Sequence, residues 1–159
     1  MLLLAREVIE MATVSDVAKW FLHRKSFTHK QLQKLCYYAQ AWHCALLGEP
    51  LFDEEIQAWI HGPVCPKLYA QYAVWGWAPI KRIRKENFNF SPETLSVLRA
   101  VYNTYAKFTG EQLEALTHSE SPWREARGNL KPYEPSEAII PVENMKKYYA
   151  EKYKQAQGD

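Results

Sequence analysis

The stretch FTHKQLQKLCYYAQAWHCALLG, residues 27–48, does more than any other part of the chain to determine the fold. Thr28 and Gln31 have the spacing of a capping box, which predicts that a helix begins there. Apolar residues then recur at helical spacing, namely Leu32, Leu35, Cys36, Ala39, Trp42 and Leu46. Gly48 supplies the stop. The resulting helix is roughly 30 Å long at 1.5 Å per residue, so we expect it to be the central element of the domain.

The remainder of the chain has the patterns of shorter helices and a small sheet. Caps and apolar spacing predict helices that begin near residues 13, 66, 91, 109, 121 and 141. Alternation predicts a strand over residues 51–60, and we expect a second strand over residues 79–84 to pair with it. Residues 155–159 are expected to be disordered. The fold class is therefore mainly α, with about six helices around a long central one and a two- or three-stranded antiparallel sheet.

Length and composition favour a single globular domain. A chain of 159 residues matches the usual size of one domain. We expect residues 1–12 to be an N-terminal extension, residues 13–128 to form the domain, and residues 129–159 to add a loop, a helix and a tail packed on it. A net charge of +2 gives no long-range attraction to nucleic acid or to a membrane surface.

Cysteine usage predicts the compartment. The chain has 3 cysteines, an odd number, and neither a signal-peptide pattern nor an apolar run of transmembrane length. These features predict free thiols in a reducing environment. We therefore expect a cytoplasmic protein without a membrane partner.

His61 and Cys65 flank a Gly62-Pro63 bend, an arrangement with two interpretations. A thiol near a helix start, with His61 or His118 as base, is a candidate nucleophile. The same residues suit a tight corner, because glycine permits unusual backbone angles and proline makes the turn rigid. Nothing marks an oxyanion hole, and no cysteine pair has the spacing of a zinc site. The pattern therefore favours the corner, with no catalytic residue, no metal and no cofactor.

An aromatic cluster precedes the main basic run of the chain, residues 81–85. Aromatic residues beside arginines are typical of protein interfaces. The candidate partner-binding residues are therefore Tyr72, Trp75, Trp77, Arg82 and Arg84. Two alternatives apply to the basic run: it binds a nucleic-acid backbone, or it protects a solvated strand edge. The first alternative would make the protein a nucleic-acid-binding phage regulator, a class that the low net charge disfavours.

Seven short motifs follow one another along the chain. They are VAKWF (17–21), LQKLCYYAQAWH (32–43), PLFD (50–53), IQAW (56–59), HGPV (61–64), PKLY (66–69) and LTHSESPW (116–123). In this order and spacing the chain resembles the SocA-like Panacea-domain antitoxin family, also described as phage-associated GepA-type proteins. The resemblance extends over about residues 13–127.

The resemblance implies a non-enzymatic bacterial antitoxin encoded by a prophage or another mobile element. Its partner would be a cognate toxin encoded beside it, neutralised by direct binding or, in the SocA type, by delivery to an ATP-dependent protease. The resemblance also implies that the motif residues define the fold, namely Trp59, His61, Gly62, Pro63, Tyr69, His118, Pro122 and Trp123. Cys65 departs from the aliphatic residue expected at its position, which argues against a catalytic thiol.

Overall fold

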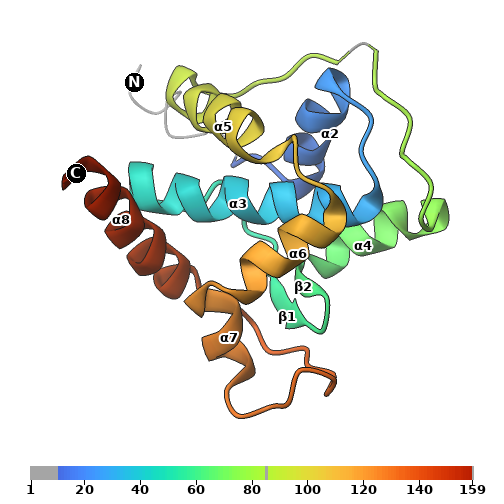
Figure 1. Ribbon diagram of the computed structural model, residues 1–159. Helices are drawn as coiled ribbons and strands as arrows, with labels where there is room; N and C mark the ends of the chain where they lie inside the picture. The colour runs from blue at the N-terminus through green and yellow to red at the C-terminus, as the bar shows by residue number, and fades with distance from the viewer. Residues whose placement is uncertain (1–10, 85, 159) are drawn as a thin grey trace, which may run out of the picture.

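The computed structural model describes residues 11–84 and 86–158, and it is built around the helix α3 (His29–Leu47) (Figure 1). The predicted capping box is present: Thr28 Oγ1 accepts from the Gln31 backbone, and the Gln31 side chain accepts from the Thr28 backbone. Gly48 ends the helix in the left-handed conformation, with φ of 83°. Residues 32–41 are all buried, so α3 is the central element that the sequence predicted.

The remaining helices surround α3, and the predicted fold class is confirmed. They are α2 (Val14–Arg24), α4 (Pro66–Tyr72), the 3-10 turn η1 (Ala73–Trp75), α5 (Pro92–Tyr105), α6 (Gly110–His118), α7 (Ser121–Arg127) and α8 (Val142–Gly158). Figure 1 shows α2 and α5 above α3, the β1–β2 hairpin below it and α8 across one end. Within the described residues the protein thus has seven α-helices and one small antiparallel sheet.

A buried polar cluster fastens α8 to α3 and to the start of α7. Glu120, the N-cap residue of α7, is 2% exposed and accepts hydrogen bonds from Tyr38 (2.7 Å) and Tyr149 (2.9 Å). Lys152 adds an ion pair to the same carboxylate at 2.9 Å. A buried carboxylate without partners is costly in free energy. Tyr149 and Lys152 of α8 satisfy it together with Tyr38 of α3, so the cluster holds α8 against α3 and the start of α7.

The sheet is a tight hairpin of β1 (Gln57–Trp59) and β2 (Gly62–Val64), in which Trp59 pairs with Gly62. The predicted strand over residues 51–60 is therefore too long. The backbone N–H groups of Leu51 and Phe52 donate to the side chain of Gln40 instead of to a strand. On the other edge of β1, the segment before α8 makes two backbone bonds, from Ala58 N to Ala138 O and from Ile140 N to Ile56 O, each 2.8 Å long.

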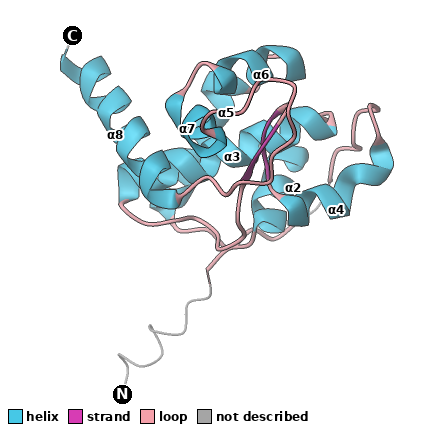
Figure 2. Ribbon diagram, turned by 90° about the horizontal axis from the view of Figure 1, so that it is seen from below, coloured by secondary structure: helices cyan, strands magenta, loops and turns pink. Residues whose placement is uncertain are grey.

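Two other predictions are wrong. Residues 79–84 do not pair with the hairpin, because Ile80 N donates to Phe27 O (2.7 Å) and Ile83 N donates to Leu22 O (2.9 Å). This segment therefore runs along α2 and the connection to α3. Residues 155–158 are helical, since α8 continues to Gly158, and Figure 2 shows its last turns projecting from the body of the molecule.

The expected N-terminal extension lies almost wholly outside the described residues, which begin at Met11. In the part of the chain that the structure describes, no helix combines the length and the apolar character needed to span a bilayer.

Candidate functional site

Gly62 forms the corner of the hairpin and is enclosed by side chains from α3 and α6. Its φ of 111° is a conformation that side-chain-bearing residues rarely adopt. A β-carbon at this position would lie 2.7 Å from Lys34 Cε and 3.0 Å from Thr117 Oγ1. The corner therefore requires glycine for two reasons, its backbone angle and the space around it.

The last of the seven motifs, residues 116–123, packs against the same hairpin. Trp123 is buried and its indole N–H donates to Trp59 O at 2.8 Å. The His118 ring stacks on Trp123, with 3.9 Å between the ring centroids. Pro122 is also buried. Segments about 60 residues apart in sequence thus meet at one corner, whose geometry is that of a packed joint.

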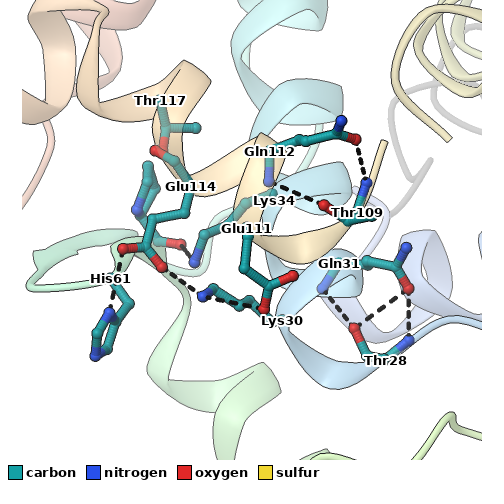
Figure 3. A network of polar contacts seen from close by, with 11 residues as sticks. Thr28, Lys30, Gln31, Lys34, His61, Thr109, Glu111, Gln112, Glu114 and Thr117 are labelled. Carbon is teal, nitrogen blue, oxygen red and sulfur yellow. Dashed lines mark hydrogen bonds and ion pairs between the residues drawn. The ribbon is translucent and has the colours of Figure 1, made fainter. Parts of the chain in front are cut away.

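An ion network joins α3, α6 and the tip of the hairpin (Figure 3). Glu114 lies between Lys30 Nζ at 2.5 Å and His61 Nδ1 at 3.3 Å. Burial acts to raise the pKa of Glu114, but the hydrogen bonds from Lys30 and His61 outweigh it and lower that pKa. The His61 side chain is 71% exposed, so it contributes to the surface as well as to the network.

Lys34 is the one lysine that is fully enclosed among the described residues. Its Nζ donates to Pro63 O over a long 3.4 Å, beneath the hairpin. Burial, followed by the charge of Lys30, lowers the pKa of Lys34 to about 7, although Glu114 opposes this shift. At neutral pH this amine is therefore only partly charged.

A groove of about 370 Å³ opens beside the corner, between α3, the hairpin and α4 with η1. Its aromatic walls are Trp59, Tyr69 and Trp77. Trp59 and Tyr69 lie 5.1 Å apart between ring centroids, and His29 lies 5.1 Å from Tyr69 on the other side. Trp77 is 83% exposed and stands at the edge. A concave site with aromatic walls and few polar groups is the usual form of a binding site.

The structure does not bring the five predicted partner-binding residues together at the groove, since Trp77 is the one of them that lines it. Trp77 lines the groove together with the motif residues Trp59, His61 and Tyr69. Arg82 lies elsewhere, beside α2, where its Nε donates to His23 O at 2.7 Å. The other three differ in exposure: Tyr72 is buried, Trp75 is half-buried and Arg84 is exposed.

Sequence reasoning missed part of the groove. Thr28, His29 and Lys30 line it from the N-cap and first turn of α3. His29 and Gln33 are four residues apart on one helical face and both line the groove, but polar residues at that spacing usually face solvent. No local pattern therefore distinguished them.

The geometry at Cys65 differs from that of a nucleophile. The side chain is buried, with 3% exposed, and burial raises the pKa of its thiol. His61, its candidate base, is exposed and turned towards Glu114. Across residues 11–84 and 86–158, no group of three or more histidine, cysteine, aspartate or glutamate side chains is placed to hold a metal ion.

Comparison with protein families identifies the chain. The family model described as "Antitoxin SocA-like, Panacea domain" matches residues 32–124. The chain belongs to this family. The match to the Panacea domain begins in α3 and ends within α7, so it contains the corner and most of the groove, whose lining residues Thr28, His29 and Lys30 precede it. Neither a curated protein nor a solved structure matches the chain at a significant level.

Two helices of this protein flank the matched Panacea region. α2 precedes residue 32, and α8 follows residue 124. α8 is nevertheless joined to the Panacea core through the Glu120 cluster. Nine of the twelve residues that line the groove lie within the matched region, and the other three, Thr28, His29 and Lys30, precede it.

Proposed function

We propose that this protein is a non-enzymatic antitoxin that neutralises a toxin by binding it through the groove beside the hairpin. One observation carries the proposal: the exposed Trp77 stands at a concave site whose other walls are the family-motif residues Trp59, His61 and Tyr69. A groove formed by residues of the family motifs, with an exposed aromatic side chain beside them, suits the specific recognition of another protein.

The exposed apolar side chains near the groove have the properties of an interface core. Trp77 is 83% exposed and Tyr69 is 44% exposed, and both line the groove. Burying a side chain of this size against a partner contributes about 1.5–3 kcal/mol. In a typical interface a few aromatic residues supply most of the binding energy. These exposed aromatic side chains support the groove as the place where a partner binds.

The same contact suits two routes of neutralisation. In the first, the bound antitoxin covers the working surface of the toxin. In the second, it acts as an adaptor that presents the toxin to an ATP-dependent protease. We place either event in the cytoplasm of a bacterium that carries a prophage or related element, where the three free cysteines Cys36, Cys44 and Cys65 stay reduced.

Expression of the neighbouring reading frame tests the proposal. That frame is expressed alone and then together with this chain, and growth is followed. We expect growth arrest in the first case and its relief in the second, with co-purification of the two proteins. A neighbour that is harmless alone, or arrest that this chain does not relieve, would contradict the proposal. Relief that requires an intact protease would favour the adaptor route.

A second candidate function is binding to nucleic acid through the basic run. Lys81, Arg82 and Arg84 are exposed, and Arg82 contacts α2 next to the exposed Arg24. Such a cluster would contact phosphates, and the affinity would then fall steeply with salt. Filter binding of a duplex at several salt concentrations, with Arg84→Ala as the variant, tests this. Salt-independent or unmeasurable binding excludes it.

A further inference from the structure

A second concave site, the arginine pocket, has a volume of about 350 Å³ and lies between α2, α5 and the extended segment after η1. Its lining residues are Trp20, His23 and Arg24 of α2, Arg82 of that segment and Tyr102 of α5. α2 and α5 lie on the side of α3 away from the hairpin (Figure 1). Among the described residues, none lines both the arginine pocket and the groove.

Two aromatic rings hold the guanidinium group of Arg24 in place. Its Cζ lies 4.3 Å from the ring centroid of Trp20 and 5.6 Å from that of Tyr102. The two rings are packed edge to face, with 6.4 Å between their centroids. Stacking of this kind fixes the plane of the guanidinium group and leaves the N–H groups at its edge available to donate.

A backbone contact positions Arg82 at the same pocket. Its Nε donates to His23 O at 2.7 Å, which leaves the two terminal nitrogens of the guanidinium group available to a ligand. The His23 ring is held in turn by a contact of 2.9 Å between its Nδ1 and Ile83 O. Arginines from two separate segments are thus held by different contacts, with their remaining donors at one pocket.

The C-terminal end of α2 contributes little repulsion to an anion in this pocket. The carbonyl groups of a last helical turn carry partial negative charge, which would oppose anion binding. Here Leu22 O accepts from Ile83 N at 2.9 Å, and His23 O accepts from Arg82 Nε. Because these carbonyls already have donors, the arginine side chains dominate the local charge.

The positive charge of the arginine pocket is not compensated by the protein. Among the residues that the structure describes, neither Arg24 nor Arg82 takes part in an ion pair. The pocket lining also contains no acidic residue. Two permanently charged groups at one pocket repel each other, so an anion that binds both is favoured.

A phosphate monoester matches these donors better than a carboxylate. It carries roughly −1.5 to −2 charges at neutral pH and three acceptor oxygens, so it can accept from both arginines and balance both charges. The volume of the pocket lies in the range of about 300–1,000 Å³ that is typical of small-molecule sites. A duplex is bound by basic groups spread along many phosphates, whereas these two arginines meet at one concave site. The arrangement therefore favours a small ester.

We propose that the arginine pocket binds the phosphate group of a small phosphate monoester, such as a nucleoside monophosphate, through Arg24 and Arg82. Each guanidinium group donates to the phosphate oxygens, and the stacking on Trp20 and Tyr102 keeps Arg24 in position. This site is additional to the groove at which we place toxin binding, and its ligand binds whether or not the antitoxin function holds.

Adenosine monophosphate is the probe for this site. Adenosine is the control that lacks the phosphate, inorganic phosphate is the competitor that lacks the ester, and a short DNA duplex represents a nucleic-acid backbone. Binding to the ¹⁵N-labelled protein is followed by NMR through the indole signal of Trp20, with Trp77 of the groove as the internal control. The variants are Arg24→Gln and Arg82→Gln. Arg124→Gln is the matched control, because Arg124 is exposed on α7 and lines neither site.

We expect adenosine monophosphate to shift the Trp20 signal, to leave the Trp77 signal in place and to bind about tenfold or more tightly than adenosine. Inorganic phosphate should displace it, because both present the same oxygens to the arginines. Arg24→Gln and Arg82→Gln should each weaken its binding about fivefold or more, and Arg124→Gln less than about twofold.

Arg24→Lys separates the charge of the side chain from its fork geometry. This variant should bind adenosine monophosphate more weakly than the wild type and more tightly than Arg24→Gln, because it keeps the charge and loses the paired donors. Arg24 and Arg82 are both exposed, so the variants should fold, and thermal denaturation checks this.

The site would be contradicted by adenosine binding as tightly as adenosine monophosphate, by a shift of Trp77 without one of Trp20, or by equal affinities in Arg24→Gln and Arg124→Gln. A duplex that binds through Arg24 while adenosine monophosphate does not bind would also contradict it, and would support the second candidate function instead. None of these results changes the growth assay, so the antitoxin function is tested separately.

Discussion

The end of the Lys34 side chain occupies the space that a β-carbon on Gly62 would need. The two positions are only 2.7 Å apart, and Thr117 closes the other side at 3.0 Å. A glycine of the hairpin and a buried lysine of the central helix thus fit together. This relationship shows that the hairpin corner has no room for a side chain at residue 62, and it leads directly to the first two predictions.

Gly62→Ala should lower the free energy of unfolding by about 3 kcal/mol, because it adds an overlap to the cost of a positive φ. Gly48→Ala is the matched control, since Gly48 has φ of 83° but no atom within 4 Å of its β-carbon position. The control should cost about 1 kcal/mol. Urea denaturation measures both. Equal losses in the two variants would show that the space beside Lys34 is unimportant.

Lys34→Met should remove a pH dependence of stability. The pKa of Lys34 is about 7 in the folded protein and 10.5 in the unfolded chain. Between these values the unfolded chain holds a proton that the folded protein has released, so the stability of the wild type rises with pH in this window. Below the window both states hold the proton, and the contribution of Lys34 to stability no longer changes with pH. The difference in unfolding free energy between wild type and Lys34→Met should therefore change by up to about 1.4 kcal/mol per pH unit.

Chemical denaturation at several pH values between 6 and 10.5 measures this difference. Comparison with the variant cancels the titration of tyrosines and cysteines, which both proteins share. A difference that stays constant across the window would mean that Lys34 keeps an ordinary pKa when buried.

Glu120→Ala should destabilise the protein by about 3 kcal/mol, because it leaves the buried hydroxyl of Tyr38 without its acceptor and that of Tyr149 with Tyr37 as its one remaining partner among the described residues. Lys152→Ala removes the half-exposed partner of the same carboxylate and should cost about 1 kcal/mol or less. Thermal unfolding followed by circular dichroism compares the two. A larger loss in Lys152→Ala would contradict the assignment of Glu120 as the centre of the cluster.

Cys65 should react slowly with iodoacetamide at neutral pH. Burial leaves 3% of the side chain exposed and raises the pKa of the thiol, so both access and thiolate population are low. Mass spectrometry of the native protein should show alkylation at least tenfold slower than in urea. Labelling in the native state as fast as in urea would reveal an accessible, reactive thiol and would reopen the nucleophile interpretation.

Helix starts could be predicted from the sequence because their signals are local. The capping boxes at Thr28 and Gln31 and at Thr109 and Gln112 both form as expected. Each requires only residues three apart, so no distant contact decides it. The central helix could be predicted for the same reason, from its continuous apolar spacing.

A small antiparallel sheet was predicted, but the strands that pair in it could not be, because long-range contacts decide the pairing. Pro63 has no N–H to donate, and its position after Gly62 indicated a break, yet β2 forms there and pairs with β1. The strand predicted over residues 79–84 has an imperfect alternation, and Ile80 in it pairs with the backbone of Phe27, which lies between two helices. Neither pairing has a signal in the local sequence.

The groove was predicted only in part, since its walls come from separate segments. Trp77 was a candidate through its aromatic neighbours, and Trp59 and Tyr69 were known only as motif residues. Their meeting depends on α4, which turns the chain back past the hairpin. Arg82 was grouped with Trp77 because it is close in sequence, but the extended chain carries it to α2.

The affinity of the purified protein for the toxin that we propose as its partner, measured by calorimetry in wild type and in Trp77→Ala, tests the central claim most directly. Tyr133→Ala is the matched control, because Tyr133 is 70% exposed and does not line the groove. We predict that Trp77→Ala weakens binding at least tenfold, which is about 1.4 kcal/mol or more of binding free energy, and leaves thermal stability unchanged. Tyr133→Ala should change the affinity less than threefold. Unchanged affinity in a correctly folded Trp77→Ala variant would contradict the account.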